Sequence, residues 1–274
     1  MCQTKSGIIL KDRIFLPDYD SHGKMLEELK IKDTRENAER LFVRAELLPS
    51  DGDVFSDIST WRFRVDQDIL PEWFVAEYEE KRMREAVADW AKAHIHIDED
   101  NLHLSDGRHI IKGGKGIVID GTATVDYIVG ESTVDYIGGK ATINSIGGES
   151  KVYRIGEKST VDYIGGESTV YRIGEKSTVD YIGGESTVDY IGGKAKVNRI
   201  GEKSTVDYIG GESKVYRIGE KSTVDCIGGI ATVFTSKYSE WKNLKNAQIS
   251  DDAMVKDCFH KIIYQAGDWE FRKV

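Results

Sequence analysis

The sequence predicts a mainly β protein, in which a β-solenoid follows a small N-terminal α+β domain. From Gly121 onward the chain repeats with a nine-residue period, which is typical of stacked repeat proteins. Before about residue 100 this period is absent, and apolar residues recur at the spacings of ordinary strands and helices. We therefore expect an α+β domain over 1–100, a capping coil over 101–120, the solenoid over 121–233 and a C-terminal cap over 234–274.

The first part of the N-terminal domain is expected to contain a hairpin and a short helix. Apolar runs at 8–10 and 13–16 flank Lys11 and Asp12, which is the pattern of two strands joined by a tight turn. Ser21 then precedes an apolar helical spacing, and its hydroxyl can cap the helix N-terminus.

Two further strands and a long helix complete this domain. Strands are expected over 42–48 and 60–65, and in the second of them apolar and charged residues alternate, so one face is buried. From about Ala76 the residues that line one side of a helix recur at positions i, i+4, i+7 and i+11. They are Met83, Val87, Trp90 and His94.

Each repeat unit reads as a short strand that ends in a turn. A typical unit is Gly130-Glu-Ser-Thr-Val-Asp-Tyr-Ile-Gly138. β-Branched residues dominate it and glycines bound it, as in strands between turns. Nine residues are too few to close a coil around a core, so we expect two units, about 18 residues, in each coil.

The third, fifth and eighth positions of each unit are predicted to fill the interior. The third is Ser or Ala, the fifth is Val with one Ile, and the eighth is Ile in every full unit. Burial of the β-branched side chains supplies the apolar driving force for stacking. The predicted core includes Val125, Val134, Val152, Val161, Val170, Val179, Ile128, Ile137, Ile155, Ile164, Ile173 and Ile182.

Irregular coils are expected to cap both ends of the repeats. Apolar residues alternate at broken spacing in 102–104 and 117–119 before the repeats, and in 247–249 and 253–255 after them. An open strand edge invites pairing with other chains. The aromatic tail over 264–271, with a hairpin turn at 266–268, is predicted to cover it.

Two parts of the chain resemble known families. The stretches Phe42-Val-Arg-Ala-Glu-Leu47, Val65-Asp-Gln-Asp68 and Pro71-Glu-Trp-Phe74 resemble an uncharacterised domain that heads repeat-containing proteins of gut Firmicutes and their phages. The resemblance covers roughly residues 1–100 and implies a phage or prophage setting, but no activity. The repeats resemble left-handed hexapeptide and pentapeptide β-solenoids in architecture, although their nine-residue unit departs from both motifs.

Composition argues against nucleic-acid and membrane binding. The net charge is −9, whereas binders of nucleic acid or anionic membranes need a basic face. No run approaches 18 apolar residues, and the N-terminus lacks the pattern of a signal peptide. Cys2, Cys226 and Cys258 fit neither a disulfide framework nor a zinc knuckle. We expect a cytoplasmic protein, in a bacterial host or a phage particle, without a cofactor.

Several activities known for repeat solenoids are not expected. Calcium-binding nonapeptides need Gly and Asp where this unit has Ser or Ala and Val. Hexapeptide-type acyl transfer needs a histidine base, and none occurs between His109 and His260. Lysines interrupt the threonine column that ice binding would need, and mixed charge argues against mimicry of DNA.

A coil of two units would align like charges in columns at the second position. One column reads Glu131, Glu149, Glu167, Glu185, Lys203 and Lys221, and the other reads Lys140, Lys158, Lys176, Lys194 and Glu212. Aligned like charges repel. Glu157 and Glu175 compensate the lysines, whereas the first four glutamates have no such neighbour and are predicted to contact a cationic partner. The alternative is that duplication of a 27-residue block copied these charges without selection.

Surface tyrosines beside carboxylates are a second candidate for partner binding. Tyr136 and Tyr190 represent them. Tyrosine is enriched at interfaces because it offers a large, stiff and amphipathic surface. The alternative is that stacked tyrosines only stabilise neighbouring strands.

Candidate chemistry is confined to two small groups of residues. His94 and His96 would face the same way on a strand and so could bind a metal. Asp66 and Asp68 could act as paired carboxylates. The alternatives are solvated residues at a domain junction and a polar loop.

The sequence therefore favours a non-enzymatic binding or assembly protein with the solenoid as a rigid scaffold. Near-identical units repeat one surface many times, whereas an active site needs a unique constellation. The expected partner is another protein or a second copy of the chain. The rival hypothesis is an enzyme with a metal or carboxylate site in the N-terminal domain or at the domain junction.

Overall fold

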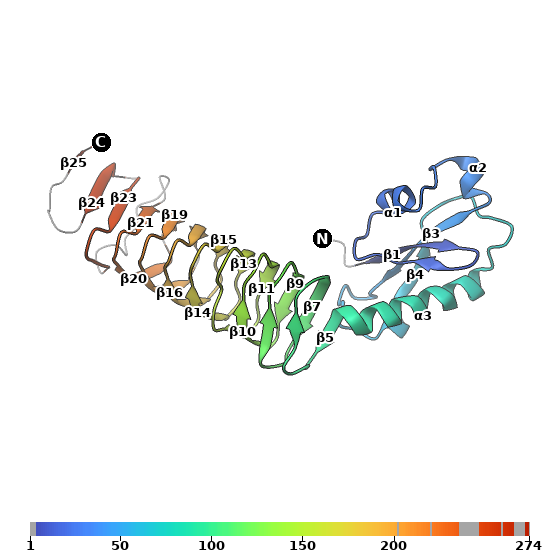
Figure 1. Cartoon of the computed structure of the whole chain (residues 1–274), viewed down its shortest axis with the longest axis horizontal. Coiled ribbons are helices and arrows are strands. Elements are labelled where there is room, and N and C mark those ends of the chain that lie inside the picture. Colours follow the sequence, from blue (N-terminus) through green and yellow to red (C-terminus); the bar gives the residue numbers. More distant parts are fainter. Residues whose placement is uncertain are drawn as a thin grey trace. The chain divides into compact units, whose positions relative to one another are not determined.

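The structure, a computed structural model, describes residues 4–201, 203–219, 221–235, 247–258, 260–265 and 272–273. The chain forms two compact units, Met1–Ile95 and His96–Val274. The first is a small α+β unit and the second is a β-solenoid, which confirms the predicted fold class (Figure 1).

The N-terminal unit is built on a four-stranded antiparallel sheet with the order β2-β1-β3-β4. The predicted hairpin is present, and the third strand has the predicted bounds. The fourth begins later than predicted, because η1 (Ile58–Thr60) and Trp61 precede it. The strands are β1 (Lys5–Leu10), β2 (Ile14–Phe15), β3 (Phe42–Leu48) and β4 (Arg62–Val65).

Three helices accompany this sheet in the described part of the unit. In α1 (His22–Glu28) the Ser21 hydroxyl accepts a hydrogen bond from the Lys24 amide at 3.4 Å, as predicted. The predicted long helix is α3 (Ala76–His94), which buries Met83 and Val87. Helix α2 (Arg35–Ala38) is not predicted by the sequence pattern, because four residues are too few to show a helical period.

The solenoid consists of two sheets whose strands alternate along the chain. Within the repeats, each strand pairs in parallel with the strand two repeat units further on, as Thr124 with Thr142 and Thr142 with Thr160. Two nonapeptides per coil are therefore confirmed. The first solenoid sheet holds β5 (Ile95–Ile97), β7 (Arg108–Lys112), β9 (Thr124–Val129), β11 (Thr142–Ile146), β13 (Thr160–Ile164), β15 (Thr178–Ile182), β17 (Lys196–Ile200), β19 (Lys214–Ile218), β21 (Thr232–Thr235), β23 (Met254–Asp257), β24 (Ile262–Gln265) and β25 (Arg272–Lys273).

The second solenoid sheet takes the intervening strands. Its members are β6 (His103–Leu104), β8 (Ile117–Ile119), β10 (Thr133–Ile137), β12 (Lys151–Val152), β14 (Thr169–Ile173), β16 (Thr187–Ile191), β18 (Thr205–Ile209), β20 (Thr223–Ile227) and β22 (Gln248–Ile249). Each coil therefore has two turns that join the sheets, one at each edge of the solenoid.

The ends of the solenoid continue the same pairing. Strand β5 is the first strand of its sheet, so the chain passes into the solenoid unit at His96, before the expected domain boundary at 100. Strands β6, β7 and β8 form the expected irregular first coil. At the other end β24 pairs antiparallel with β23. The turn predicted at 266–268 lies outside the described residues.

The solenoid interior follows the predicted positions. All twelve residues of the predicted core have an exposed fraction of 0%. The third-position serines are equally buried, and each hydroxyl donates to the carbonyl three residues earlier, as from Ser150 to Gly147 and from Ser159 to Gly156 at 2.7 Å. Because this bond satisfies the hydroxyl within the turn, a polar residue can occupy the core.

Candidate functional site

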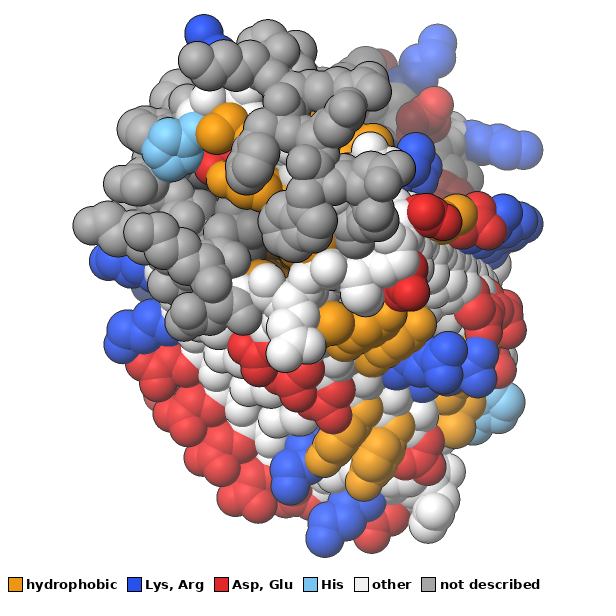
Figure 2. Space-filling model, turned by 90° about the vertical axis from the view of Figure 1, so that its left-hand side faces the viewer, with side chains coloured by type: hydrophobic (Ala, Val, Ile, Leu, Met, Phe, Trp, Pro, Cys, Tyr) orange, Lys and Arg blue, Asp and Glu red, His pale blue; other side chains and the backbone are white. Residues whose placement is uncertain are grey.

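The turns at one edge of the solenoid carry exposed glutamates, and we call Glu131, Glu149 and Glu167 the acidic edge. Their backbones are fixed coil on coil, since the Glu149 amide donates to the Gly130 carbonyl and the Glu167 amide to the Gly148 carbonyl, both at 2.9 Å. Figure 2 shows a continuous row of acidic side chains along this edge, with basic side chains at one end of it. None of the three has an ion pair in the described structure.

Glu185 lies in the same column but differs from the other three. Its carboxylate accepts a hydrogen bond from the Lys203 ammonium at 2.6 Å. This bond, followed by the attraction of the Lys203 charge, lowers the pKa of Glu185. The expectation that all four glutamates lack a cationic neighbour is therefore wrong for Glu185, because the charge of the column reverses at the next coil.

The opposite edge carries lysines, and we call Lys140, Lys158 and Lys176 the basic edge. All three are exposed and, among the described residues, none has an ion pair. Lys194 ends the series and is 3.3 Å from the Glu212 carboxylate. A shallow groove of about 790 Å³ follows this edge from Gly121 and Thr122 to Lys194.

Glu157 and Glu175 do not neutralise the basic edge as expected. The Glu157 carboxylate accepts hydrogen bonds from the Tyr136 hydroxyl and the Gly139 amide, both at 2.8 Å. Glu175 accepts from the Glu157 amide at 2.6 Å and pairs with Arg154. Both carboxylates therefore fold back onto the previous coil, and Lys140, Lys158 and Lys176 have no ion pair within the described part of the chain.

Tyr136 and Tyr190 pack along columns of stacked side chains. The Arg154 guanidinium lies over the Tyr136 ring at 5.7 Å, and burial together with the hydrogen bond to Glu157 raises the pKa of Tyr136 to about 12. Tyr190 lies between Arg172, at 5.1 Å, and Tyr208, at 5.3 Å. Both tyrosines are half-buried and engaged within the chain, which favours the strand-stabilising alternative.

Two solenoid tyrosines that are more exposed than Tyr136 and Tyr190 were not among the predicted partner-binding residues. Tyr153 and Tyr171 are 48% and 37% exposed and stack at 4.9 Å between ring centroids. They occupy the sixth position, where most units have Asp or Asn. Their separation by one whole coil was the signal that could have identified them.

His94 and His96 do not share a strand. Helix α3 extends to His94, whose ring stacks on Trp90 at 4.8 Å and lies 3.4 Å from the Asp18 carboxylate. His96 is buried on β5 and contacts Glu99 at 2.9 Å and His109 at 3.1 Å. The predicted pairing on one strand is wrong, because His94 is the last residue of the helix, as its helical spacing indicates, and the strand begins only at Ile95.

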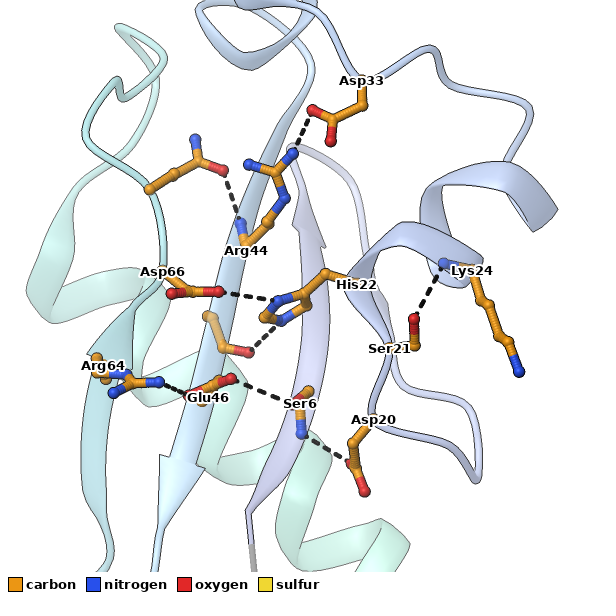
Figure 3. Close-up of polar contacts among 12 residues, drawn as sticks. Ser6, Asp20, Ser21, His22, Lys24, Asp33, Arg44, Glu46, Arg64 and Asp66 are labelled. Atoms are coloured by element: carbon orange, nitrogen blue, oxygen red, sulfur yellow. Dashed lines mark hydrogen bonds and ion pairs between the residues drawn. The ribbon is translucent and has the colours of Figure 1, made fainter. Parts of the chain in front are cut away.

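A group of metal-binding side chains occurs within the N-terminal unit instead. One ligand atom each of His22, Glu46 and Asp66 lie within 4.8 Å of one another (Figure 3). They come from the start of α1, the middle of β3 and the residue after β4. Asp66 was half of the predicted carboxylate pair. Asp68, the other half, is exposed and lies outside this group.

The hydrogen bonds of His22 define which nitrogen faces the group. Its Nε2 is 3.3 Å from the Ala45 carbonyl, which can only accept, so Nε2 carries a hydrogen. Its Nδ1 is 3.3 Å from the Asp66 carboxylate. The side chains of His22 and Glu46 are only 10% and 12% exposed, and Glu46 also pairs with Arg64. Nδ1 can therefore hold a proton shared with Asp66, or it can ligate a cation.

Comparisons with protein-family models, with curated proteins and with solved structures found no match to this chain. In the described residues no helix combines the length and apolar character needed to cross a membrane. The residues and their geometry are accordingly the basis for a functional proposal.

Proposed function

We propose that this protein is a non-enzymatic binding and assembly protein that uses its solenoid as a rigid scaffold. The observation that carries the proposal is the acidic edge, where three exposed glutamates without an ion pair are held in line at intervals of one coil. The resemblance of the N-terminal part to phage-associated domains supports a setting in a phage or prophage, as a structural accessory or as an antagonist of host defence.

The acidic edge is suited to a cationic partner for two physical reasons. Parallel strands are about 4.8 Å apart, so successive carboxylates repel one another, and a cation relieves this repulsion. The backbone of each turn is fixed by bonds to the coil below, so binding requires little ordering of the chain. A repeated surface of this kind matches a partner that is itself linear.

A labelled oligolysine peptide tests the acidic edge directly. We expect the peptide to bind the full chain and the Glu131→Gln/Glu149→Gln/Glu167→Gln variant to bind at least about tenfold more weakly, since three exposed charges are lost. Fluorescence anisotropy at low and high salt measures this, and salt should weaken binding to the unchanged chain. The β signal in circular dichroism should not change.

The matched control removes the same charge from elsewhere on the solenoid. It converts to Asn three exposed aspartates that have no ion pair in the described structure, namely Asp135, Asp162 and Asp225. Peptide affinity should stay within about twofold of the unchanged chain. If both triple variants bind the peptide equally weakly, the loss of affinity comes from the change in net charge alone. The acidic edge would then have no support as a binding site.

The second candidate function is an enzyme with a metal site in the N-terminal unit, which the group of His22, Glu46 and Asp66 favours. One imidazole and two carboxylates suit a zinc or iron ion with open positions for water. The Ala45 carbonyl orients the ring as second-sphere acceptors do in metal sites. Such an ion would supply an activated water.

Zinc titration with calorimetry and metal analysis of the full chain test this second candidate. We expect one zinc per chain, with affinity reduced at least about tenfold by His22→Gln and by Asp66→Asn. Asp68→Asn is the matched control, because Asp68 lies two residues on and outside the group, and it should bind like the unchanged chain. Binding that is insensitive to His22 and Asp66 would exclude a site there.

A further inference from the structure

We propose that the partner of the acidic edge is the basic edge of a second copy of this chain, with the two solenoids side by side, parallel and in register. This inference rests on the proposed function and names the partner. It follows from three features of the two edges: their phase, the place where their charge reverses, and the groove along the basic edge.

The two edges have the same period and the same phase. The acidic edge has a glutamate in every coil from Glu131, and the basic edge has a lysine in every coil from Lys140. Each lysine follows a glutamate by one nonapeptide. Two parallel copies, related by translation from edge to edge, therefore bring all three glutamates of one copy opposite all three lysines of the other at once.

The charge reversal selects the register. On the acidic side the sign changes between Glu185 and Lys203, and on the basic side it changes between Lys194 and Glu212. In register, Glu185 faces Lys194 and Lys203 faces Glu212. Together with the three glutamate–lysine pairs of the two edges, this gives five facing pairs, all of opposite charge. A shift by one coil places either Lys203 against Lys194 or Glu185 against Glu212, and like charges at an interface oppose association.

An antiparallel arrangement pairs fewer of the charges on the two edges. If the second solenoid runs the other way, four glutamate–lysine pairs can still form. Lys203 and Glu212 then have no opposite charge across the interface, because Thr122 and the end of the column face them. The parallel arrangement is the one that pairs every charge of the two columns from Glu131 to Glu212.

The shape of the basic edge suits the row of glutamates. The groove of about 790 Å³ is lined by the lysines and by first-position residues such as Gly139 and Gly193, which have no side chain to fill it. The carboxylates of Glu157 and Glu175 are turned onto the previous coil and do not block the lysines. The contact uses the acidic edge of one copy and the basic edge of the other. In a pair, one copy therefore keeps a free basic edge and the other a free acidic edge, so further copies can add at both ends of the row.

Sedimentation velocity of the full chain tests the inference. We expect oligomers that grow with protein concentration at low salt and dissociate at high salt. The Glu131→Lys/Glu149→Lys/Glu167→Lys variant has two basic edges, and the Lys140→Glu/Lys158→Glu/Lys176→Glu variant has two acidic ones. Each alone should sediment as a monomer, and an equimolar mixture of the two should associate again.

Zero-length carbodiimide cross-linking reports the register. In one chain Glu131 and Lys140 lie on opposite edges, so an amide between them identifies a contact between copies. The expected cross-links are Glu131 to Lys140 and Glu149 to Lys158. Links from Glu131 to Lys176 or Lys194 would overturn the parallel register.

The outcomes separate this inference from the proposed function. A chain that stays monomeric at low salt, yet binds oligolysine through the acidic edge, overturns self-association and leaves the proposed function standing. Oligomers that persist in both charge-reversed variants overturn the edge-to-edge contact. Insensitivity of oligolysine binding to the acidic edge overturns the proposed function itself.

Discussion

Val170→Asp is expected to unfold the solenoid repeats. Val170 has an exposed fraction of 0% on β14, and in the register of the sheet it lies between Val152 and Val188. A carboxylate at this point enters a core of valine and isoleucine in which the described neighbours offer no cation. Burial of an unpaired charge of this kind costs about 4 kcal/mol or more, a large part of the stability of a whole domain.

The neighbouring residue supplies the control for this prediction. Thr169→Asp introduces the same side chain one position earlier, where the native side chain is only half-buried and points out of the sheet. We expect a change of less than about 1 kcal/mol in the free energy of unfolding. Circular dichroism and urea unfolding compare the two variants. A soluble Val170→Asp protein with an undiminished β signal would contradict the inward placement of the fifth position.

Gly148→Val is expected to have the second largest effect. Gly148 has φ +65, a conformation that β-branched residues rarely adopt. A Cβ there would lie 2.8 Å from the Gly130 amide nitrogen and 2.9 Å from its carbonyl oxygen, so the backbones of two coils would have to separate. We expect a loss of about 2–4 kcal/mol in the free energy of unfolding.

Two other substitutions serve as controls for the loss of stability in Gly148→Val. Gly147→Ala should be nearly neutral, because Gly147 has no positive φ and a Cβ there meets nothing within 4 Å. Gly148→Glu should cost less than Gly148→Val, since Glu157 occupies the equivalent position with φ 52 and its carboxylate accepts the Gly139 amide hydrogen. Urea midpoints at constant m measure all three. Equal losses for Gly147→Ala and Gly148→Val would show that close packing of the coils is not the cause.

Much of the solenoid could be predicted from the sequence because, with a strict period, the number of a residue gives its coil, its sheet and its position within the repeat unit. Once two units make a coil, the pairing of Thr124 with Thr142 and the inward direction of Val170 and Ile173 follow. The same period assigns the second-position glutamates and lysines to the acidic and basic edges. In the N-terminal unit, Ser21 indicated a helix cap, and the alternation over 60–65 indicated a strand.

Side-chain pairing was predicted less well, because it depends on which coil lies above. Arg154 pairs with Glu175 on the next coil and not with Glu157 in its own turn, since the Glu157 carboxylate is already bound to Gly139 and Tyr136. The group of His22, Glu46 and Asp66 was missed for a related reason. Its members are far apart in the sequence, and only the antiparallel sheet brings them together.

The alternation of strands between two sheets makes the solenoid sensitive to the parity of its repeat number. Loss or gain of two units, or any even number, leaves every later residue on its own sheet and edge. An odd number, such as the three units of a 27-residue block, moves every later residue to the opposite sheet, and the second-position charges beyond the junction exchange edges. Growth by such a block would interrupt both columns, whereas growth by pairs of units extends them. The length of this protein can therefore change without loss of its two charged edges only by whole coils.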